Sequence, residues 1–300
     1  MRIRDLDHLV DVVSRKKKTR PLAVAYPHDP ATLRSLSHAA EKDIARPLLF
    51  GDQDRIMQVA EAENIPTNGL TLFDVKDEDE AIRRTVQAVI RKDAEILMKG
   101  SCTTRSILGA VLRAGREMIR KGNLMSFVGL FYAPMYERLI IITDPAVNIN
   151  PNLNRKLKII HNSIAAARKL GIRTPRVAIL AAIEKVNISK MPITGEAQLI
   201  EKMSKAGIFK NAFVEGPFAL DNAVSPSAAT IKHLSGEVAG KADILVSPDI
   251  ESANILYKSL ISFTDIPFAN VAVGARVPIV LPSRADSEKT KIASIALSSF

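Results

Sequence analysis

The most informative polar residues of this chain follow a short apolar segment near its C-terminus. Val277–Leu281 is rich in apolar and β-branched residues and is typical of a buried strand, and Ser283, Arg284 and Asp286 come soon after it. In open α/β sheets, ligands bind beyond the carboxyl ends of the strands. An arginine guanidinium matches the geometry of phosphate oxygens, so this turn suits a substrate that carries phosphate. The alternative is an ordinary turn in which Ser287 caps the next helix.

Polar residues also follow other predicted strands. The predicted strand Glu95–Met98 leads into a hydroxyl-rich helix entrance, where backbone N–H groups favour an anion. Taken alone, this segment and the polar turns after the other predicted strands are explained as turns with helix caps. The polar residues at these strand ends are Lys99, Gly100, Ser101, Thr103, Thr104, Arg105, Asp144, Asn148, Glu184, Asn187, Asp221 and Asn254, and the family resemblance given below implies that they bind phosphate or another anionic substrate.

Strand-like and helix-like segments alternate along most of the chain, which predicts largely parallel sheets with helices on both faces. The predicted strands are 21–26, 47–51, 95–98, 124–131, 138–143, 176–182, 212–215, 243–246, 267–273 and 277–281. The predicted helices are 30–42, 53–63, 77–91, 105–120, 151–170, 194–205, 251–264 and 288–299. Asp29 and Pro30 are expected to open the first of these helices, and Gly171 to close the helix 151–170.

The composition indicates a globular protein of two domains. The chain has 300 residues, of which 47% are hydrophobic and 25% charged, and a single core seldom grows to this length. The formal net charge of +10 includes a basic run at 15–20 and a basic segment at 151–176. Nucleic-acid binding usually adds aromatic stacking residues, but this chain has no Trp. Small polyanionic substrates therefore fit the charge better than nucleic acid does.

Other classes of protein fit the sequence poorly. No segment is apolar for the length of a membrane span, and residues 1–5 lack the apolar region of a secretion signal. Cys102 is the only cysteine, which excludes an internal disulfide and favours a cytoplasmic location. The five histidines are scattered, so we expect no metal site.

Six segments, in the same order along the chain, resemble the phosphate acetyl/butyryltransferases, or phosphotransacylases. Their amino-acid sequence is closer to the butyryl-type branch of that family. The resemblance runs from about residue 21 to the C-terminus. The matching segments are TDPAVNINPNL (143–153), GIRTPRVAILAAIEKVN (171–187), KMPITGEAQLI (190–200), VEGPFALDNAVS (214–225), VAGKADILVSPDIESANILYKSL (238–260) and VPIVLPSRADS (277–287).

The resemblance implies two α/β domains with the active site in a cleft between them, in an architecture like that of isocitrate and isopropylmalate dehydrogenases. We expect residues 1–140 and 285–300 to form the first domain and residues 141–284 the second. The resemblance also implies a homodimer. It implies coenzyme A (CoA) as a substrate, with no permanently bound cofactor.

The implied reaction is acyl-CoA + phosphate ⇌ acyl phosphate + CoA, with a short acyl group such as butyryl or acetyl. Ser283 Oγ would donate to the CoA sulfur, and Arg284 would hold phosphate and spread the developing charge. Asp286 is the nearest carboxylate and is predicted to be catalytic, although it could equally cap a helix. Alternatives are an acyl-phosphate synthase that uses acyl carrier protein, and a catalytically weakened regulatory protein that binds CoA or phosphate.

The match departs from the family at two positions. Acetyl-type members carry a carboxylate seven residues after the motif serine, where this chain has Thr290, so the general base is unassigned. Relatives also carry an arginine where this chain has Gly109, and Arg105 lies one helical turn earlier on the same face. Arg105 is the favoured substitute. An acyl-enzyme on Cys102 is a further alternative, because a helix N-terminus can activate a thiol.

Overall fold

The computed structural model describes residues 1–16 and 19–300, which divide into two compact units. Unit 1 comprises residues 1–5 and 126–266, and unit 2 comprises residues 6–125 and 267–300. The domain boundaries expected at 140/141 and 284/285 stay a prediction. Lys17 and Lys18, which belong to the basic run noted above, lie outside the described residues.

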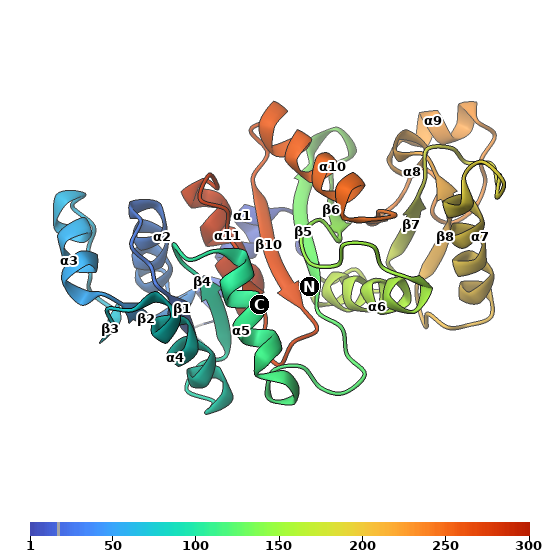
Figure 1. Cartoon of the computed structure of the whole chain (residues 1–300). Coiled ribbons are helices and arrows are strands. Elements are labelled where there is room, and N and C mark those ends of the chain that lie inside the picture. The colour runs from blue at the N-terminus through green and yellow to red at the C-terminus, as the bar shows by residue number, and fades with distance from the viewer. Residues whose placement is uncertain (17–18) are drawn as a thin grey trace. The chain divides into compact units, whose positions relative to one another are not determined.

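The sheet of unit 2 is built mainly from parallel strands (Figure 1). Its strand order is β3-β2-β1-β4-β11-β10, with parallel pairing from β3 through β11 and antiparallel pairing of β10 with β11. The carboxyl ends of the five parallel strands therefore meet at one edge of the sheet. The strands are β1 (Arg20–Ala25), β2 (Ala45–Gly51), β3 (Thr71–Asp74), β4 (Ile96–Lys99), β10 (Phe268–Val273) and β11 (Ile279–Val280).

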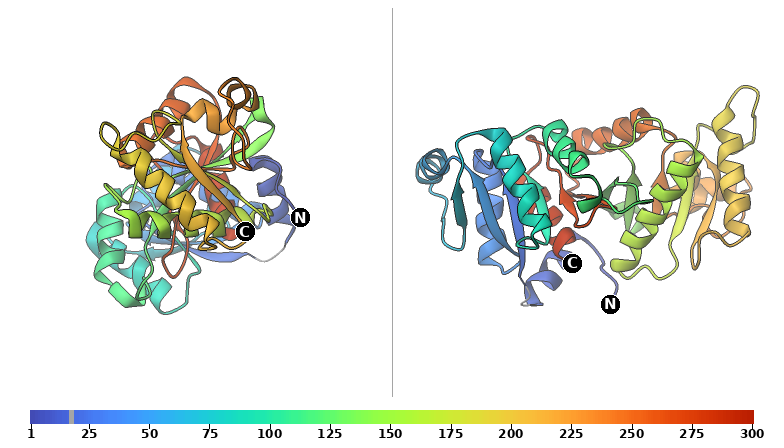
Figure 2. Two further views of the ribbon diagram at one scale, coloured as in Figure 1. Left: turned by 90° about the vertical axis from the view of Figure 1, so that its right-hand side faces the viewer. Right: turned by 60° about the horizontal axis from the view of Figure 1, so that its bottom comes forward.

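Helices cover both faces of the unit 2 sheet (Figures 1 and 2). Helices α4 and α5 pack on one face, and α1, α2 and α11 gather on the other. The bounds in unit 2 are α1 (Leu6–Arg15), α2 (Pro30–Glu41), α3 (Gln53–Ala62), α4 (Glu78–Ile90), α5 (Thr104–Arg113), η1 (Gly115–Glu117) and α11 (Glu288–Ser299). Each of α2, α3, α4, α5 and α11 begins after an Asp, Thr or Ser whose side chain accepts a backbone N–H.

Unit 1 has its own sheet, of strand order β5-β6-β9-β7-β8. The β5–β6 pair is antiparallel and the other pairs are parallel, so β6, β9, β7 and β8 also end at one edge. The strands are β5 (Ser126–Ala133), β6 (Arg138–Thr143), β7 (Arg176–Leu180), β8 (Phe213–Phe218) and β9 (Ile244–Val246). The helices are η2 (Pro134–Tyr136), α6 (Leu153–Lys169), α7 (Pro192–Lys205), α8 (Leu220–Val224), α9 (Pro226–Ile231) and α10 (Ile250–Phe263).

The sequence-based elements agree with most of these bounds but not all. The helix predicted to reach Arg120 ends at Arg113, because the chain adopts a positive φ of 54° at Gly115 soon afterwards. Five elements have no counterpart among the predicted ones: α1, β3, η2, α8 and α9. Two strand pairs, β5–β6 and β10–β11, are antiparallel within a framework that was expected to be largely parallel.

Gly171 ends α6 as predicted, and it also has a second role. Its φ is +87°, in the left-handed region that favours glycine. A Cβ at this position would lie 2.3 Å from Met1 O, so only glycine lets the N-terminal segment approach this closely. That segment is fixed by a hydrogen bond from Ile3 N to Leu170 O of 2.9 Å.

We predict that Gly171→Ala destabilises the protein more than Gly207→Ala does. Gly207 follows α7 in the same unit with a nearly equal φ of +90°, but nothing lies within 4 Å of a Cβ there. The shared left-handed backbone should cost each variant about 1–2 kcal/mol. Gly171→Ala should lose more, because Met1 must also move. Urea unfolding of both variants measures the difference, and equal losses would contradict the second role of Gly171.

Candidate functional site

The carboxyl edge of the unit 2 sheet brings together loops that are distant in sequence. Residues 26–29 follow β1, residues 100–104 follow β4, and residues 281–287 follow β11. Because β4 pairs in parallel with both β1 and β11, the three loops lie next to one another. Ser283, Arg284 and Asp286 therefore lie beside Lys99–Thr104, as the sequence predicted for strand ends.

Ser283 and Arg284 form a tight turn that Asp286 holds in place. Ser283 N donates to Asp286 Oδ2 at 2.8 Å, and Asp286 N donates back to Ser283 O at 3.2 Å. Only 7% of Asp286 is exposed, and its carbonyl accepts from the buried Lys291 Nζ. The carboxylate of Asp286 is thus engaged in shaping the turn. Ser283 Oγ accepts a long hydrogen bond from Ala285 N, of 3.4 Å, which leaves its O–H group able to donate.

Thr290 has a structural task in the first turn of α11. Its Oγ1 accepts from Phe268 N at 3.3 Å and from Ser287 Oγ at 3.2 Å. Its N–H donates to Ser287 Oγ, so Ser287 is the N-cap of this helix. The buried hydroxyl of Thr290 satisfies a buried strand N–H of β10.

Ser101 connects all three loops of this edge. Its N–H donates to Tyr26 O at 2.8 Å, and its Oγ donates to Asp29 Oδ2 at 3.1 Å and accepts from His28 N at 3.0 Å. Its carbonyl accepts from Arg284 Nη2 at 3.1 Å. Ser101 thus fixes the position of Arg284, whose side chain is exposed.

Gly100 is required by close packing at the same place. A Cβ there would lie 2.5 Å from Ala25 O and 2.7 Å from Tyr26 O. Lys99, by contrast, turns its side chain inward. Its Nζ donates to the carbonyl oxygens of Gly100 at 3.0 Å and Cys102 at 3.3 Å, and burial lowers its pKa.

The start of α5 carries the remaining predicted residues of unit 2. Thr103 is the N-cap and accepts from Ser106 N at 3.0 Å, and Thr104 is the first helical residue. Arg105 is exposed and lines a groove of about 1040 Å³ between α4 and α5, together with Gly109 and Arg113. Arg113 Nη1 lies 3.3 Å from the position of a Cβ on Gly109. The sequence analysis had not selected Arg113.

Cys102 is buried and poorly suited to nucleophilic attack. Its Sγ lies 3.8 Å from Ala25 O, and burial raises the pKa of the thiol to about 11. Since the thiolate is the nucleophilic form, a raised pKa disfavours an acyl-enzyme on this residue.

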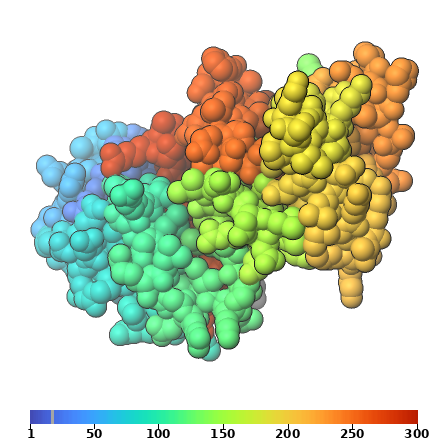
Figure 3. All heavy atoms as spheres, turned by 45° about the vertical axis from the view of Figure 1, so that its right-hand side comes forward, coloured from blue at the N-terminus to red at the C-terminus, as the bar shows by residue number. Residues whose placement is uncertain are grey.

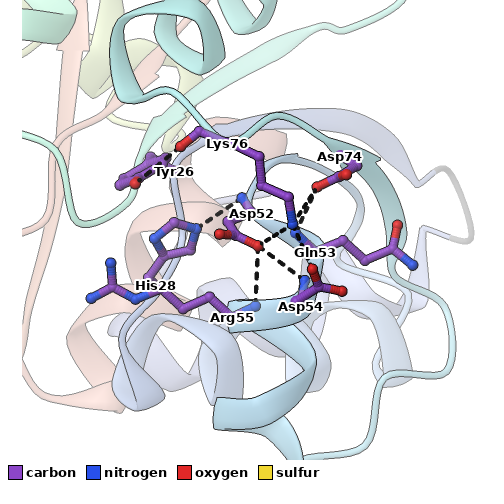
Figure 4. Close-up of polar contacts among 8 residues, drawn as sticks. All are labelled: Tyr26, His28, Asp52, Gln53, Asp54, Arg55, Asp74 and Lys76. Atoms are coloured by element: carbon purple, nitrogen blue, oxygen red, sulfur yellow. Dashed lines mark hydrogen bonds and ion pairs between the residues drawn. The ribbon is translucent and has the colours of Figure 1, made fainter.

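A further polar cluster stands at the ends of β1, β2 and β3 (Figure 4). Lys76 Nζ bonds to both Asp52 and Asp54 at 2.7 Å. Asp52 N donates to His28 Nε2 at 3.1 Å, which requires that nitrogen to be unprotonated. Only 6% of His28 is exposed, and burial lowers its pKa to about 4. His28 is therefore a neutral link between the loops that follow β1 and β2, and sequence reasoning had not selected it.

The predicted residues that follow β6 organise one loop of unit 1. Asp144 is buried and accepts from Val147 N at 2.9 Å and from Asn148 Nδ2 at 2.6 Å. Burial raises the pKa of the Asp144 carboxyl. Asn254 Nδ2, on α10, donates to Pro145 O at 2.9 Å and ties the helix to the same loop.

The other predicted residues of unit 1 lie on the loops after β7 and β8. Glu184 faces Lys232 Nζ at 3.6 Å and Asn222 Nδ2 at 3.5 Å, and its pKa is lowered chiefly by a backbone hydrogen bond. Asp221 is exposed in the first turn of α8, next to Asn222. Asn187 shapes its own turn, where its Oδ1 accepts from Lys190 N at 3.2 Å.

A cavity of about 810 Å³ opens at the carboxyl edge of the unit 1 sheet. Its walls are mainly apolar, and an ion pair of the buried Lys156 with the partly exposed Glu196 contributes to its lining. None of the lining residues is among the site residues predicted from the sequence. They are Asn150, Pro151, Asn152, Lys156, Leu180, Ala181, Ala182, Pro192, Ile193, Glu196, Leu220, Ser247, Pro248, Asp249, Ser252 and Leu256.

Across residues 1–16 and 19–300, no helix has the length and apolar character needed to span a membrane. Within the same residues, no cluster of three or more His, Cys, Asp or Glu side chains is arranged to hold a metal ion.

Comparison with known proteins gives consistent matches. Residues 80–299 match the family model described as "Phosphate acetyl/butaryl transferase". The chain is 40% identical to a phosphate butyryltransferase of Clostridium beijerinckii, over 97% of this chain and 96% of that protein. It is 42% identical to a phosphate acetyltransferase of Thermotoga maritima, over 98% of both.

Solved structures agree with this result. A branched-chain phosphotransacylase from Enterococcus faecalis superposes with a TM-score of 0.81 at 29% identity, covering 93% of this chain and 98% of that one. A 4-hydroxythreonine-4-phosphate dehydrogenase from Burkholderia phymatum has a TM-score of 0.55 at 12% identity, covering 94% and 98%, and shows a shared fold only. The predicted α/β, dehydrogenase-like fold class is confirmed.

We predict that His28 makes the protein less stable as the pH falls from 6.5 to about 4. The pKa of histidine is about 6.5 in the unfolded chain and about 4 in the folded protein. In this window the unfolded state binds more protons, so acid favours unfolding, by up to about 3 kcal/mol. Thermal unfolding at several pH values should show a weaker pH dependence for His28→Gln. The control, His233→Gln, alters an exposed histidine and should follow the wild type. An unchanged pH dependence in His28→Gln would refute the assignment.

Proposed function

This chain belongs to the phosphate acetyl/butyryltransferase family, and we propose that it catalyses acyl-CoA + phosphate ⇌ acyl phosphate + CoA with a short acyl group. The observation that carries the proposal is the Ser283–Arg284 turn. The turn lies at the carboxyl edge of the parallel strands of unit 2. Ser283 N donates to Asp286 Oδ2, and Arg284 Nη2 donates to the Ser101 carbonyl. A preorganised guanidinium beside a hydroxyl donor suits a reaction in which charge develops on phosphate and sulfur.

We assign the reacting groups of the turn as follows. Arg284 binds phosphate through the guanidinium donors that Ser101 does not use, and orients a phosphate oxygen toward the thioester carbon. Ser283 Oγ donates to the sulfur as the C–S bond breaks. Free thiols have a pKa of about 8.5, so a hydrogen-bond donor of this kind stabilises the departing thiolate. Asp286 acts as a positioning residue, since its carboxylate holds the Ser283 backbone.

Direct transfer between CoA and phosphate is favoured over an acyl-enzyme. The one cysteine of the chain, Cys102, is buried, and the pKa of its thiol is raised to about 11. The thiol is therefore protonated at neutral pH and weakly nucleophilic. This supports attack of phosphate on the thioester within a ternary complex.

We propose further that the remaining predicted residues contact CoA or phosphate. In unit 2 the backbone N–H groups at the start of α5, beside Thr103 and Thr104, form an anion-binding end of a helix. Arg105 and Arg113 line the adjoining groove, and we assign them to the phosphates of CoA. The same groove is also lined by Arg83 and by the carboxylates of Asp77, Asp79, Glu80 and Glu117. In unit 1 we assign binding roles to the loops that carry Asp144, Asn148, Glu184, Asn187, Asp221 and Asn254.

For the acyl group we propose only that it is short. The butyryl- and acetyl-transferring relatives are 40% and 42% identical to this chain, so identity does not distinguish the two substrates. We infer a cytoplasmic location because the single cysteine is unpaired and CoA is an intracellular substrate. We propose no permanently bound cofactor.

We also propose a homodimer, supported by helix α10. Ile255 and Phe263 are 67% and 84% exposed on this apolar helix, which stands on the surface of unit 1 (orange in Figure 3). Exposed apolar clusters of this kind often mark protein interfaces. A second copy of the same chain would cover them.

We predict that the purified protein releases CoA from butyryl- or acetyl-CoA only when phosphate is present. Ser283→Ala and Arg284→Ala should each lower turnover by about 10²–10³-fold, because each removes a donor to developing charge. A coupled assay of CoA release measures this, with Lys289→Ala on the exposed surface as the control. Acyl-carrier-protein thioesters form a second assay arm. Activity with those thioesters alone, or near-wild-type turnover in Arg284→Ala, would overturn the assignment.

We predict that the chain sediments as a dimer and that Phe263→Asp weakens the dimer by at least tenfold in Kd. A charge on α10 would have to be desolvated in the proposed interface. Analytical ultracentrifugation over a range of concentrations tests this. Met135→Asp serves as the control, since Met135 is equally exposed but lies outside α10. A monomeric wild type, or a dimer unaffected by Phe263→Asp, would refute this interface.

A further inference from the structure

The cavity at the carboxyl edge of the unit 1 sheet has the size and position of a ligand site. Its volume of about 810 Å³ lies within the range of about 300–1,000 Å³ that is usual for ligand pockets. Its lining includes Ala181 directly after β7, Ser247 directly after β9, and the N-terminal turns of α6, α7 and α10. Open α/β sheets bind their ligands at this edge, beyond the carboxyl ends of the strands. The chemistry of the lining therefore indicates which ligand the cavity takes.

An ion pair in the lining keeps unused hydrogen-bonding positions. Lys156 Nζ donates to Glu196 Oε1, and the Lys156 side chain is only 4% exposed. In the part of the chain that the structure describes, neither side chain has another hydrogen bond or ion pair. Lys156 thus keeps N–H donors, and Glu196 Oε2 remains an acceptor. A donor beside an acceptor matches the C=O and N–H groups of an amide.

Ser247 adds a polar group that is independent of this ion pair. It lines the cavity and is only 5% exposed, and its N–H donates to Thr143 O at 3.0 Å. Its Oγ has no hydrogen-bond partner among the described residues. Buried hydroxyls are normally hydrogen-bonded, and a polar group of a ligand in the cavity would supply the missing partner.

The charges of the lining do not suit a phosphate group. Lys156 is neutralised by Glu196, and the other charged residue of the lining, Asp249, is negative. Asp249 caps α10, where its Oδ1 accepts from Ser252 N at 2.8 Å. Among the described residues that line the cavity, no cation is therefore left unpaired for a phosphate. With walls that are mainly apolar, the cavity suits an uncharged molecule in which amide and apolar groups alternate.

We propose that this cavity binds the pantetheine arm of acyl-CoA. The arm is uncharged, and its two amide groups are joined by methylene groups next to a dimethyl-substituted segment with a hydroxyl. One amide N–H donates to Glu196 Oε2 and the C=O of the same amide accepts from Lys156 Nζ, while Ser247 Oγ pairs with a further polar group of the arm. The phosphates of CoA stay outside the cavity. This inference rests on the proposed function, and it specifies the part of CoA that unit 1 binds.

The test measures the binding of three probes by isothermal titration calorimetry. They are CoA, pantetheine alone, and adenosine 3′,5′-bisphosphate, which resembles the nucleotide end of CoA but lacks the arm. The variants are Ala181→Phe, which adds a ring to the cavity lining, together with Ser247→Ala and Glu196→Gln. Ala165→Phe is the matched control, because Ala165 lies on the exposed face of α6 and does not line the cavity.

We expect Ala181→Phe to weaken the binding of CoA and pantetheine by about tenfold or more, because the ring takes up space that the arm needs. Glu196→Gln should weaken both by about tenfold and Ser247→Ala by about threefold, since a charged acceptor contributes more than a hydroxyl does. The Kd of adenosine 3′,5′-bisphosphate should not change in any of these variants. The control Ala165→Phe should bind all three probes as the wild type does.

Wild-type turnover is measured separately, with CoA thioesters and with acyl-carrier-protein thioesters, because the carrier has a similar arm. If CoA thioesters are not turned over, the proposed function fails, and the assignment of the cavity to the arm of CoA fails with it. Turnover of CoA thioesters leaves the cavity to be decided by the binding data alone.

Three results would overturn the inference while the proposed function stands. One is wild-type affinity for CoA and pantetheine in Ala181→Phe. Another is an equal loss of affinity for CoA and adenosine 3′,5′-bisphosphate, which would place the nucleotide in the cavity. The third is a changed preference between acetyl- and butyryl-CoA with an unchanged Kd for CoA, which would place the acyl group there. If thermal unfolding shows that Ala181→Phe does not fold, Glu196→Gln and Ser247→Ala, which change the volume little, decide by the same readouts.

Discussion

The hydrogen bonds of Ser101 are the interactions on which the proposed active site depends. One residue joins the loops after β1, β4 and β11 through its N–H, its hydroxyl and its carbonyl. Parallel pairing alone would bring these loops near one another without fixing their conformations. Because Ser101 uses backbone as well as side-chain groups, Arg284 is held against a rigid part of the sheet edge. Gly100, which has no room for a Cβ, lets Ser101 reach that position.

Some polar residues at the Ser283–Arg284 turn hold its backbone in place, and others are available for chemistry. Asp286 and Ser287 satisfy backbone N–H groups of the turn and of the first turn of α11, and Thr290 satisfies a backbone N–H of β10. Buried N–H groups need such partners, and a side chain used in this way is poorly placed to move protons. The exposed guanidinium of Arg284 and the hydroxyl of Ser283 remain. This division explains how a chain with threonine at 290 can keep the turn intact.

Much of the fold could be predicted from local signals. The helix at 288–299 and the strand at 138–143 have the predicted bounds, because N-caps and apolar runs act over a few residues. Helix α1 also carries such a signal, because its buried Leu6, Leu9 and Val13 have helical spacing, but this segment was not predicted as a helix. Strand β3 carries none, since most of it is exposed. The candidate site was harder to predict, because the hydrogen bond from Arg284 to Ser101 joins residues 183 positions apart in the sequence. No local pattern reports a contact of that range, or the use of the Thr290 hydroxyl by Phe268.

The order of the strands has a consequence for how the chain folds as it is synthesised. In the sheet, β4 lies between β1 and β11. In the sequence, however, residues 126–266 of unit 1 stand between β4 and β11. Until β11, which begins at Ile279, has been synthesised, one edge of β4 has unpaired backbone N–H and C=O groups. Strands of other chains can pair with such an edge. Most of unit 1, in contrast, is one continuous stretch that can form its own core as it leaves the ribosome. The nascent chain thus completes its inserted unit first and closes its first sheet last, and the same closing strand delivers Ser283 and Arg284.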